Sequence, residues 1–93
     1  MKVKHLQDDP GGLPGGAWDV VVTDYEAGDW EGSGYALLRV AGTGELKEFN
    51  LGHCSCYGPW EYPPTEFKDD EYVLSSGHLP TRLVEAFREL CNG

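Results

Sequence analysis

Three segments rich in β-branched and aromatic residues dominate the first half of the chain, and glycine-containing loops separate them. They cover 17–25, 35–40 and 45–51, with the sequences AWDVVVTDY, YALLRV and ELKEFNL. This composition is typical of strands, and Gly42 and Gly44 supply the positive φ that a short hairpin loop needs. The pattern therefore predicts an antiparallel meander whose first strand places Trp18, Val20 and Val22 on one face.

The clearest helical signal lies over 80–91. Pro80 suits a first turn and Asn92-Gly93 suits a C-terminal stop, while apolar residues recur at helical spacing between them. We expect Leu83, Phe87 and Leu90 of this helix to pack on Val20, Val22, Leu38 and Phe49. One helical turn over 65–70 and a short strand over 71–75 complete the prediction. The expected fold is α+β, a three- to four-stranded antiparallel sheet with the C-terminal helix packed on one face.

The length of 93 residues allows one hydrophobic core. Residues 1–16 contain a run of Gly, Pro and Asp with little to bury, so they are expected to form a flexible N-terminal arm before a single α+β domain at 17–93. No secretory signal is expected, because no apolar segment follows Lys2 and Lys4, and the sequence has no apolar run of about 20 residues. The odd count of three cysteines favours free thiols, and hence the cytoplasm, as the location.

Negative charge is concentrated in the first third of the chain. The net charge is −9, and no Lys or Arg occurs between Lys4 and Arg39. Direct binding to nucleic acid needs a basic footprint that this sequence does not provide. A charged partner is therefore expected to be basic.

The run GHCSCYGPW at 52–60 concentrates the chain's reactive side chains. His53, Cys54 and Cys56 are potential zinc ligands, although their spacing differs from the usual pairs of knuckles. A structural corner with buried free thiols is the interpretation favoured over a metal site, since small thiols are common in cores. Thiol catalysis is a third alternative, but no positive field adjoins either cysteine. No cofactor and no enzymatic activity are expected, with zinc kept as the alternative.

The segment His53-Cys54-Ser55-Cys56-Tyr57-Gly58, followed by Trp60-Glu61, resembles a signature in small uncharacterised proteins of bacteriophages and mobile elements. The resemblance covers about 24–60. It implies a viral origin and a location in the host cell, but it implies no activity. An acidic viral protein of this size is similar in general character to anti-CRISPR proteins and other inhibitors of bacterial defence.

The loop at 24–32 interleaves carboxylates with aromatic residues. A calcium loop is one alternative, but the position of the glycine departs from the EF-hand pattern. The alternative preferred here is a protein interface, in which carboxylates imitate nucleic-acid phosphates and aromatic side chains act as anchors. The protein would then inhibit a host nucleic-acid-handling or defence complex by occupying its basic surface. The residues expected to contact that partner are Asp24, Tyr25, Glu26, Asp29, Trp30 and Glu31.

Overall fold

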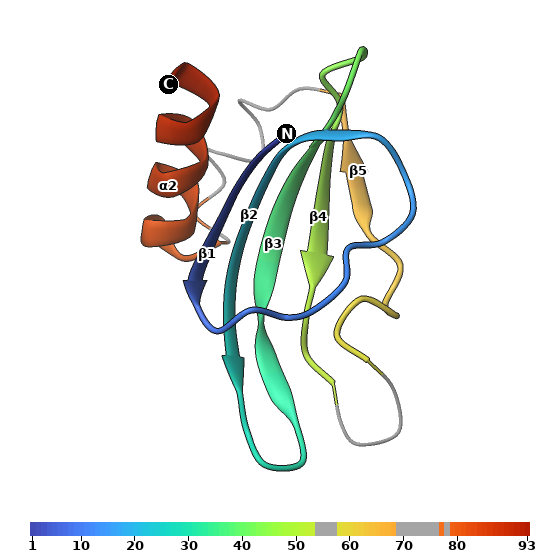
Figure 1. Ribbon diagram of the computed structural model, residues 1–93, viewed down its shortest axis with the longest axis vertical. Helices are drawn as coiled ribbons and strands as arrows, with labels where there is room; N and C mark the ends of the chain where they lie inside the picture. The colour runs from blue at the N-terminus through green and yellow to red at the C-terminus, as the bar shows by residue number, and fades with distance from the viewer. Residues whose placement is uncertain (54–57, 69–76, 78) are drawn as a thin grey trace.

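The computed structural model describes residues 1–53, 58–68, 77 and 79–93. Within these residues, a five-stranded sheet with its strands in the order of the sequence carries a C-terminal helix on one face (Figure 1). The elements are β1 (Lys2–Gln7), β2 (Trp18–Ala27), β3 (Gly32–Val40), β4 (Leu46–Asn50), β5 (Thr65–Phe67) and α2 (Thr81–Asn92). The predicted α+β class and the C-terminal helix are confirmed, whereas the sheet has five strands instead of three or four.

The first strand also makes the sheet mixed. β1 pairs with β2 in parallel, from Lys2 opposite Val20 to Gln7 opposite Tyr25, while the other neighbouring strands are antiparallel. The expectation of a flexible arm over 1–16 is therefore wrong for β1. Pairing with β2 satisfies the backbone groups on one side of this edge strand, and Leu6 packs against the core beneath the helix.

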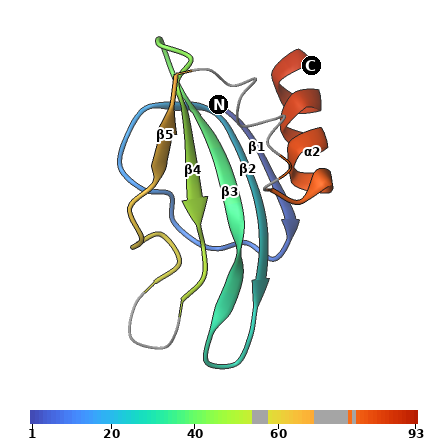
Figure 2. The ribbon, with the colours of Figure 1, turned by 180° about the vertical axis from the view of Figure 1, so that it is seen from behind.

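The connection at 8–17 crosses the face of the sheet that lies opposite α2 (Figures 1 and 2). Parallel neighbours require such a crossover because β1 ends at the opposite end of the sheet from the start of β2. Trp18 anchors the connection, since its Nε1 donates a hydrogen bond to the Pro14 carbonyl oxygen at 3.0 Å. Leu13 contributes an apolar contact to the same face.

Each face of the sheet has its own apolar cluster. Under α2, the buried side chains of Leu83 and Phe87 pack with Val20 and Val22, as expected. Leu38 and Phe49, which were also expected there, belong to the cluster on the opposite face, and Leu37 and Leu46 take their places. The cluster on the opposite face comprises Val21, Tyr25, Ala36, Leu38, Phe49 and Leu51, with Leu13, Trp18 and Trp60 packed around it.

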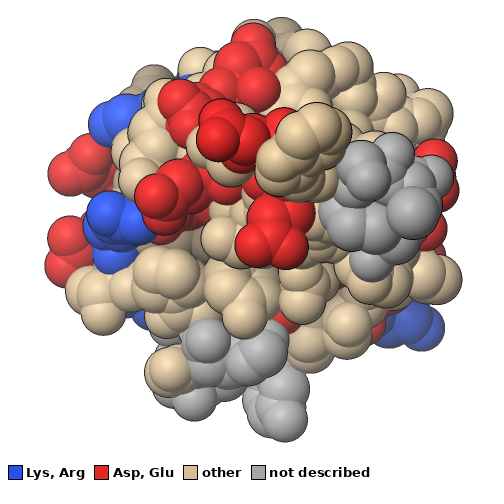
Figure 3. Space-filling view, turned by 90° about the horizontal axis from the view of Figure 1, so that it is seen from below, with Lys and Arg blue, Asp and Glu red and all other residues tan. Residues whose placement is uncertain are grey.

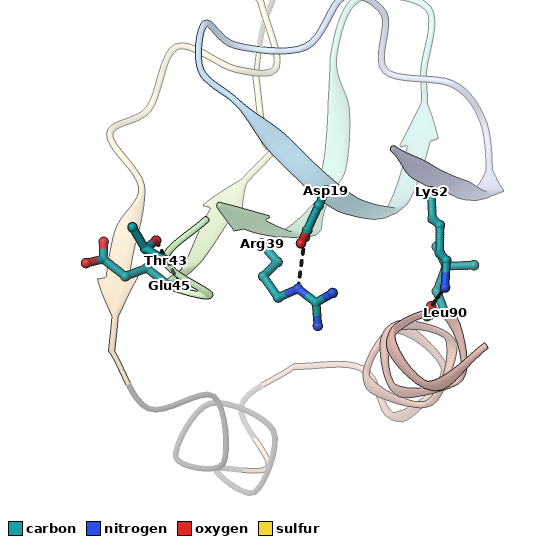
Figure 4. Close-up of polar contacts among 6 residues, drawn as sticks. All are labelled: Lys2, Asp19, Arg39, Thr43, Glu45 and Leu90. Carbon is teal, nitrogen blue, oxygen red and sulfur yellow. Dashed lines mark hydrogen bonds and ion pairs between the residues drawn. The ribbon is translucent and has the colours of Figure 1, made fainter. Parts of the chain in front are cut away.

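An irregularity near the start of β2 explains a second correction. The register with β3 shifts between Trp18 and Val20, so Trp18 packs on the opposite face from Val20 and Val22 instead of sharing their face. Asp19, at the shift, accepts a hydrogen bond from Arg39 Nε at 2.9 Å (Figure 4). The local strand pattern could not reveal this change of face.

The same view shows two further polar contacts (Figure 4). Lys2 Nζ donates to the Leu90 carbonyl oxygen at 3.2 Å and so connects β1 with the last turns of α2. In the β3–β4 loop, the Thr43 hydroxyl accepts a hydrogen bond from the Glu45 amide at 3.3 Å.

The second half of the chain differs most from expectation. A helical turn was predicted over 65–70, but residues 65–67 form β5, which pairs with β4, and a 3.1 Å Lys47–Glu66 ion pair joins the two strands. Residues 69 and 70 of that prediction lie outside the described residues. The predicted short strand over 71–75 lies outside the described residues. The predicted helix at 80–91 agrees with α2, which Pro80 precedes in an extended conformation.

Candidate functional site

The hairpin between β2 and β3 carries the exposed part of the acidic segment. The Gly28 amide donates to the Glu31 carbonyl oxygen at 2.6 Å, which closes the tip tightly enough that a Cβ at Gly28 would lie 2.7 Å from that oxygen. Trp30 projects from this tip with 80% of its surface exposed. Glu26, Asp29 and Glu31 are exposed beside it and form no ion pair with any other described residue.

The acidic segment of the sequence also forms an acidic surface at this end of the molecule. In the view from below, Asp and Glu side chains gather across the middle of the face, whereas Lys and Arg lie toward its margins (Figure 3). Exposed like charges with few neutralising neighbours produce a negative potential that attracts a basic partner.

Two residues of the predicted interface are buried, which corrects their assignment. Asp24 is 3% exposed, and its carboxylate accepts hydrogen bonds from Gln7 Nε2 at 2.7 Å and Arg82 Nε at 2.5 Å. Tyr25 is 5% exposed and packs in the cluster opposite the helix. Both side chains are buried because of their positions in β2 and their contacts with other parts of the chain. Neither is therefore available to anchor a binding partner. The engagement of Asp24 with Arg82 also removes one of the proposed calcium ligands.

The buried side chain of Tyr25 instead contacts the imidazole of His53. Its hydroxyl lies 3.2 Å from His53 Nε2, and the two ring centroids are 5.8 Å apart. Burial raises the pKa of the Tyr25 phenol above its usual value, and the negative charge of Asp8 adds to this effect. The phenol is consequently neutral at physiological pH and can act as donor or acceptor toward the imidazole.

The backbone holds His53 against the base of the hairpin. Gly32 and His53 exchange backbone hydrogen bonds of 3.0 and 3.1 Å, and a Cβ at Gly32 would lie only 2.6 Å from His53 Cε1 and would overlap the Tyr25 hydroxyl. Glycine at position 32 is therefore required for this arrangement.

A hollow of about 850 Å³ opens between the hairpin and the segment after β4. It combines carboxylates, an imidazole, neutral polar groups and one aromatic ring. The side chains that define it are Glu26, Glu31, Ser33, Asn50, His53 and Tyr62. Ser33, Asn50 and Tyr62 were not predicted as site residues, because only the strand register and the return of the chain after β4 bring them beside the acidic hairpin.

Only part of the alternative zinc set can be placed. His53 lies at the edge of the hollow, whereas Cys54 and Cys56 fall outside the described residues. Within the described ranges, no three His, Cys, Asp or Glu side chains come together as a metal site. The Nε2 atom of His53 is engaged by Tyr25, and its Nδ1 atom is buried without a hydrogen-bond partner among the same residues.

Comparisons with protein-family models, curated protein sequences and solved structures gave no significant match. The functional argument therefore depends on the geometry and charge of this chain alone. Within the part of the chain that the structure describes, no helix has the length and apolar character needed to cross a membrane.

Proposed function

We propose that this chain is a binding protein whose acidic hairpin docks on a basic surface of another protein. The observation that carries the proposal is Trp30, an aromatic side chain 80% exposed at the hairpin tip and flanked by Asp29 and Glu31. Aromatic residues dominate the energetics of many protein interfaces, and surrounding charges steer the encounter.

The fold itself gives no reason for a tryptophan at this position. Trp18 and Trp60 are half-buried and pack on the cluster opposite the helix, so each contributes to the core. Trp30 belongs to neither cluster of buried side chains. A large apolar side chain held on a tight turn away from the core is better suited to contact a partner than to stabilise the domain.

The partner class follows from the charge. Carboxylates at Glu26, Asp29 and Glu31 present spaced negative charge, as a phosphate backbone does, and they complement a groove that normally binds nucleic acid. With the resemblance to phage and mobile-element proteins, this supports an inhibitor of a host nucleic-acid-handling or defence complex, similar in mode to anti-CRISPR proteins. The protein would act in the host cytoplasm and without enzymatic chemistry.

The test is capture from a bacterial lysate with tagged protein and two charge-matched double variants. Asp29→Lys with Glu31→Lys reverses the hairpin, whereas Glu85→Lys with Glu89→Lys makes the same charge change on exposed positions of α2. We expect a nucleic-acid-binding protein to be captured by the wild type and by the helix variant, lost with the hairpin variant, and displaced by added DNA. Equal capture by both variants, or capture unaffected by DNA, would contradict the proposal.

A small zinc-binding domain is the second candidate function. The buried Nδ1 atom of His53, which has no hydrogen-bond partner among the described residues, favours it, because metal coordination is one way to satisfy such a nitrogen. Zinc would then be held by His53 with Cys54 and Cys56. Metal analysis of protein purified without chelator tests this alternative: near-stoichiometric zinc that is lost from His53→Ala supports it, and zinc-free protein with an unchanged fold opposes it.

A further inference from the structure

We propose that the tip of the hairpin imitates single-stranded nucleic acid, with the indole of Trp30 in the place of a base and the carboxylates around it in the place of phosphates. The partner would then be a protein with a groove for single-stranded DNA or RNA, in which aromatic or arginine side chains stack on successive bases. This inference rests on the proposed function and specifies the class of basic surface that the hairpin recognises.

The indole of Trp30 carries the inference. The residue is 80% exposed and belongs to neither apolar cluster, so its ring does not pack in the core. In a duplex the bases are stacked on one another, and only their edges are accessible in the grooves. In a single strand the faces of the bases are free to stack on a protein. An exposed flat ring among negative charges therefore corresponds to a base of a single strand and has no counterpart on the surface of a duplex.

Carboxylates surround the ring on the same end of the molecule (Figure 3). Glu26, Asp29 and Glu31 come from the hairpin itself. Asp8 joins them from the segment after β1, because its carboxylate accepts a hydrogen bond from the Ala27 amide at 2.9 Å. All four acidic residues are exposed, and none forms an ion pair with another described residue. Their negative charge thus complements the basic walls that hold the phosphates of a bound strand.

The shape of the tip suits a groove for one strand. β2 and β3 pair as far as Ala27 opposite Gly32, and the hydrogen bond from the Gly28 amide to the Glu31 carbonyl closes the turn. Neighbouring strands lie about 4.8 Å apart, so the tip is one narrow ridge at the end of the sheet (Figure 1). A duplex instead presents two rows of phosphates across a groove about 6 or 12 Å wide. Because the turn is already closed, little conformational entropy is lost when the ridge docks.

The first experiment is a competition on the captured protein. The tagged full chain is loaded with a nuclease-treated bacterial lysate, and the resin is then washed with oligothymidine, oligouridine or a DNA duplex at equal phosphate concentration. We expect the protein whose capture requires Asp29 and Glu31 to be released by a single strand and not by the duplex. Whether the thymidine or the uridine strand releases it shows whether the groove normally binds DNA or RNA.

The second experiment asks whether the aromatic face of Trp30 is what binds. The captured protein is purified, and displacement of a fluorescent single strand from it is followed by anisotropy. Trp30→Ala should weaken displacement by about thirtyfold or more, as for other interface anchors. Trp30→Tyr, which keeps a ring, should bind about two- to tenfold more tightly than Trp30→Leu, which is apolar without a ring.

Val3→Ala is the matched control for these variants. It removes another exposed apolar side chain, at the start of β1 and at the other end of the sheet from the hairpin (Figure 1). Displacement by this variant should equal that of the wild type. Melting temperatures of the Trp30 variants should also equal that of the wild type, because the side chain is exposed.

Release by the duplex as readily as by a single strand, or failure of both single strands to release the protein, would overturn this inference. So would equal affinities of Trp30→Leu and Trp30→Tyr, which would mean that the tip fills an apolar pocket and does not stack. If capture depends on Asp29 and Glu31 but only the duplex releases the protein, the proposed function stands and this inference is wrong. If the charge-reversed hairpin is captured as well as the wild type, the proposed function itself is wrong.

Discussion

The carboxylate of Asp24 on β2 lies 2.5 Å from Nε of Arg82 in the first turn of α2, although 58 residues separate them in the chain. The Asp24 side chain is only 2% exposed, whereas that of Arg82 is 63% exposed. The pair fastens the helix to the end of the sheet that bears the acidic hairpin. A charge in the most acidic part of the sequence is thus used for structure and not for binding.

Asp24→Asn should destabilise the fold by about 1–3 kcal/mol, because a buried hydrogen bond to Arg82 loses its charge and the hydrogen bond from Gln7 is disturbed. Asp29→Asn is the matched control, since Asp29 is exposed and unpaired among the described residues, and it should change stability by no more than about 0.5 kcal/mol. Urea denaturation of the three proteins measures both effects. Similar midpoints for the two variants would show that the Asp24–Arg82 pair contributes nothing.

Phe87→Ala should cost about 3–5 kcal/mol of unfolding free energy, as other large-to-small core substitutions do. Phe87 is 1% exposed and belongs to the cluster between α2 and the sheet. For a domain of this size the loss is much of the total stability. Arg88→Ala, at the neighbouring exposed position, is the control; a melting temperature for Phe87→Ala equal to that of the control would mean that the helix is not docked.

Tyr25→Phe should flatten the alkaline limb of the stability profile. Because the pKa of Tyr25 is raised above 10.0 in the folded state, the folded protein holds this proton more tightly than the unfolded chain does. Its contribution is present below about pH 10 and is lost as the pH rises through the folded pKa. Melting temperatures from pH 8 to 11.5 should fall more steeply for the wild type than for Tyr25→Phe, and parallel curves would contradict the assignment.

Trp30→Ala should weaken binding to the partner while leaving the stability of the fold nearly unchanged. The side chain is 80% exposed, so the unfolding free energy should change by no more than about 0.5 kcal/mol. Affinity for the captured partner should fall by at least about 2 kcal/mol, mainly through faster dissociation, as for a desolvated anchor.

Asp29→Lys with Glu31→Lys should instead slow association, and this effect should diminish as salt rises. Surface plasmon resonance measures the association and dissociation rates separately. Wild-type kinetics for both Trp30→Ala and the double lysine variant would mean that the acidic face serves only to keep the protein soluble.

The parts of the fold that were predictable are those with strong local patterns. The strand around Val20–Val22 and the helix carrying Leu83 and Phe87 are specified by β-branched runs and by helical periodicity, and both are present. β1 was missed because its sequence, KVKHLQ, is polar and its pairing partner begins beyond a run of glycines and prolines. Parallel pairing leaves no hairpin signal in the sequence.

For the candidate site, exposure of Glu26, Asp29, Trp30 and Glu31 agrees with their assignment to a surface loop. The burial of Asp24 could not be foreseen, because its partner Arg82 comes from the far end of the chain. The hollow was also unpredictable, since Tyr62 reaches it from a proline-rich segment with no periodic pattern. Local patterns specify elements, whereas sites depend on which elements meet.

The parallel pairing of β1 has a kinetic consequence. β1 and α2 both contact β2, and Lys2 reaches Leu90 across 88 residues of sequence. Such distant contacts require large loops to close before they stabilise anything, so the chain should fold in milliseconds or more slowly, unlike small helical bundles. The β2–β3–β4 meander, whose contacts are local, is the natural place for structure to begin. The two flanking segments would then join it late, and their docking, more than the meander, would set the folding rate.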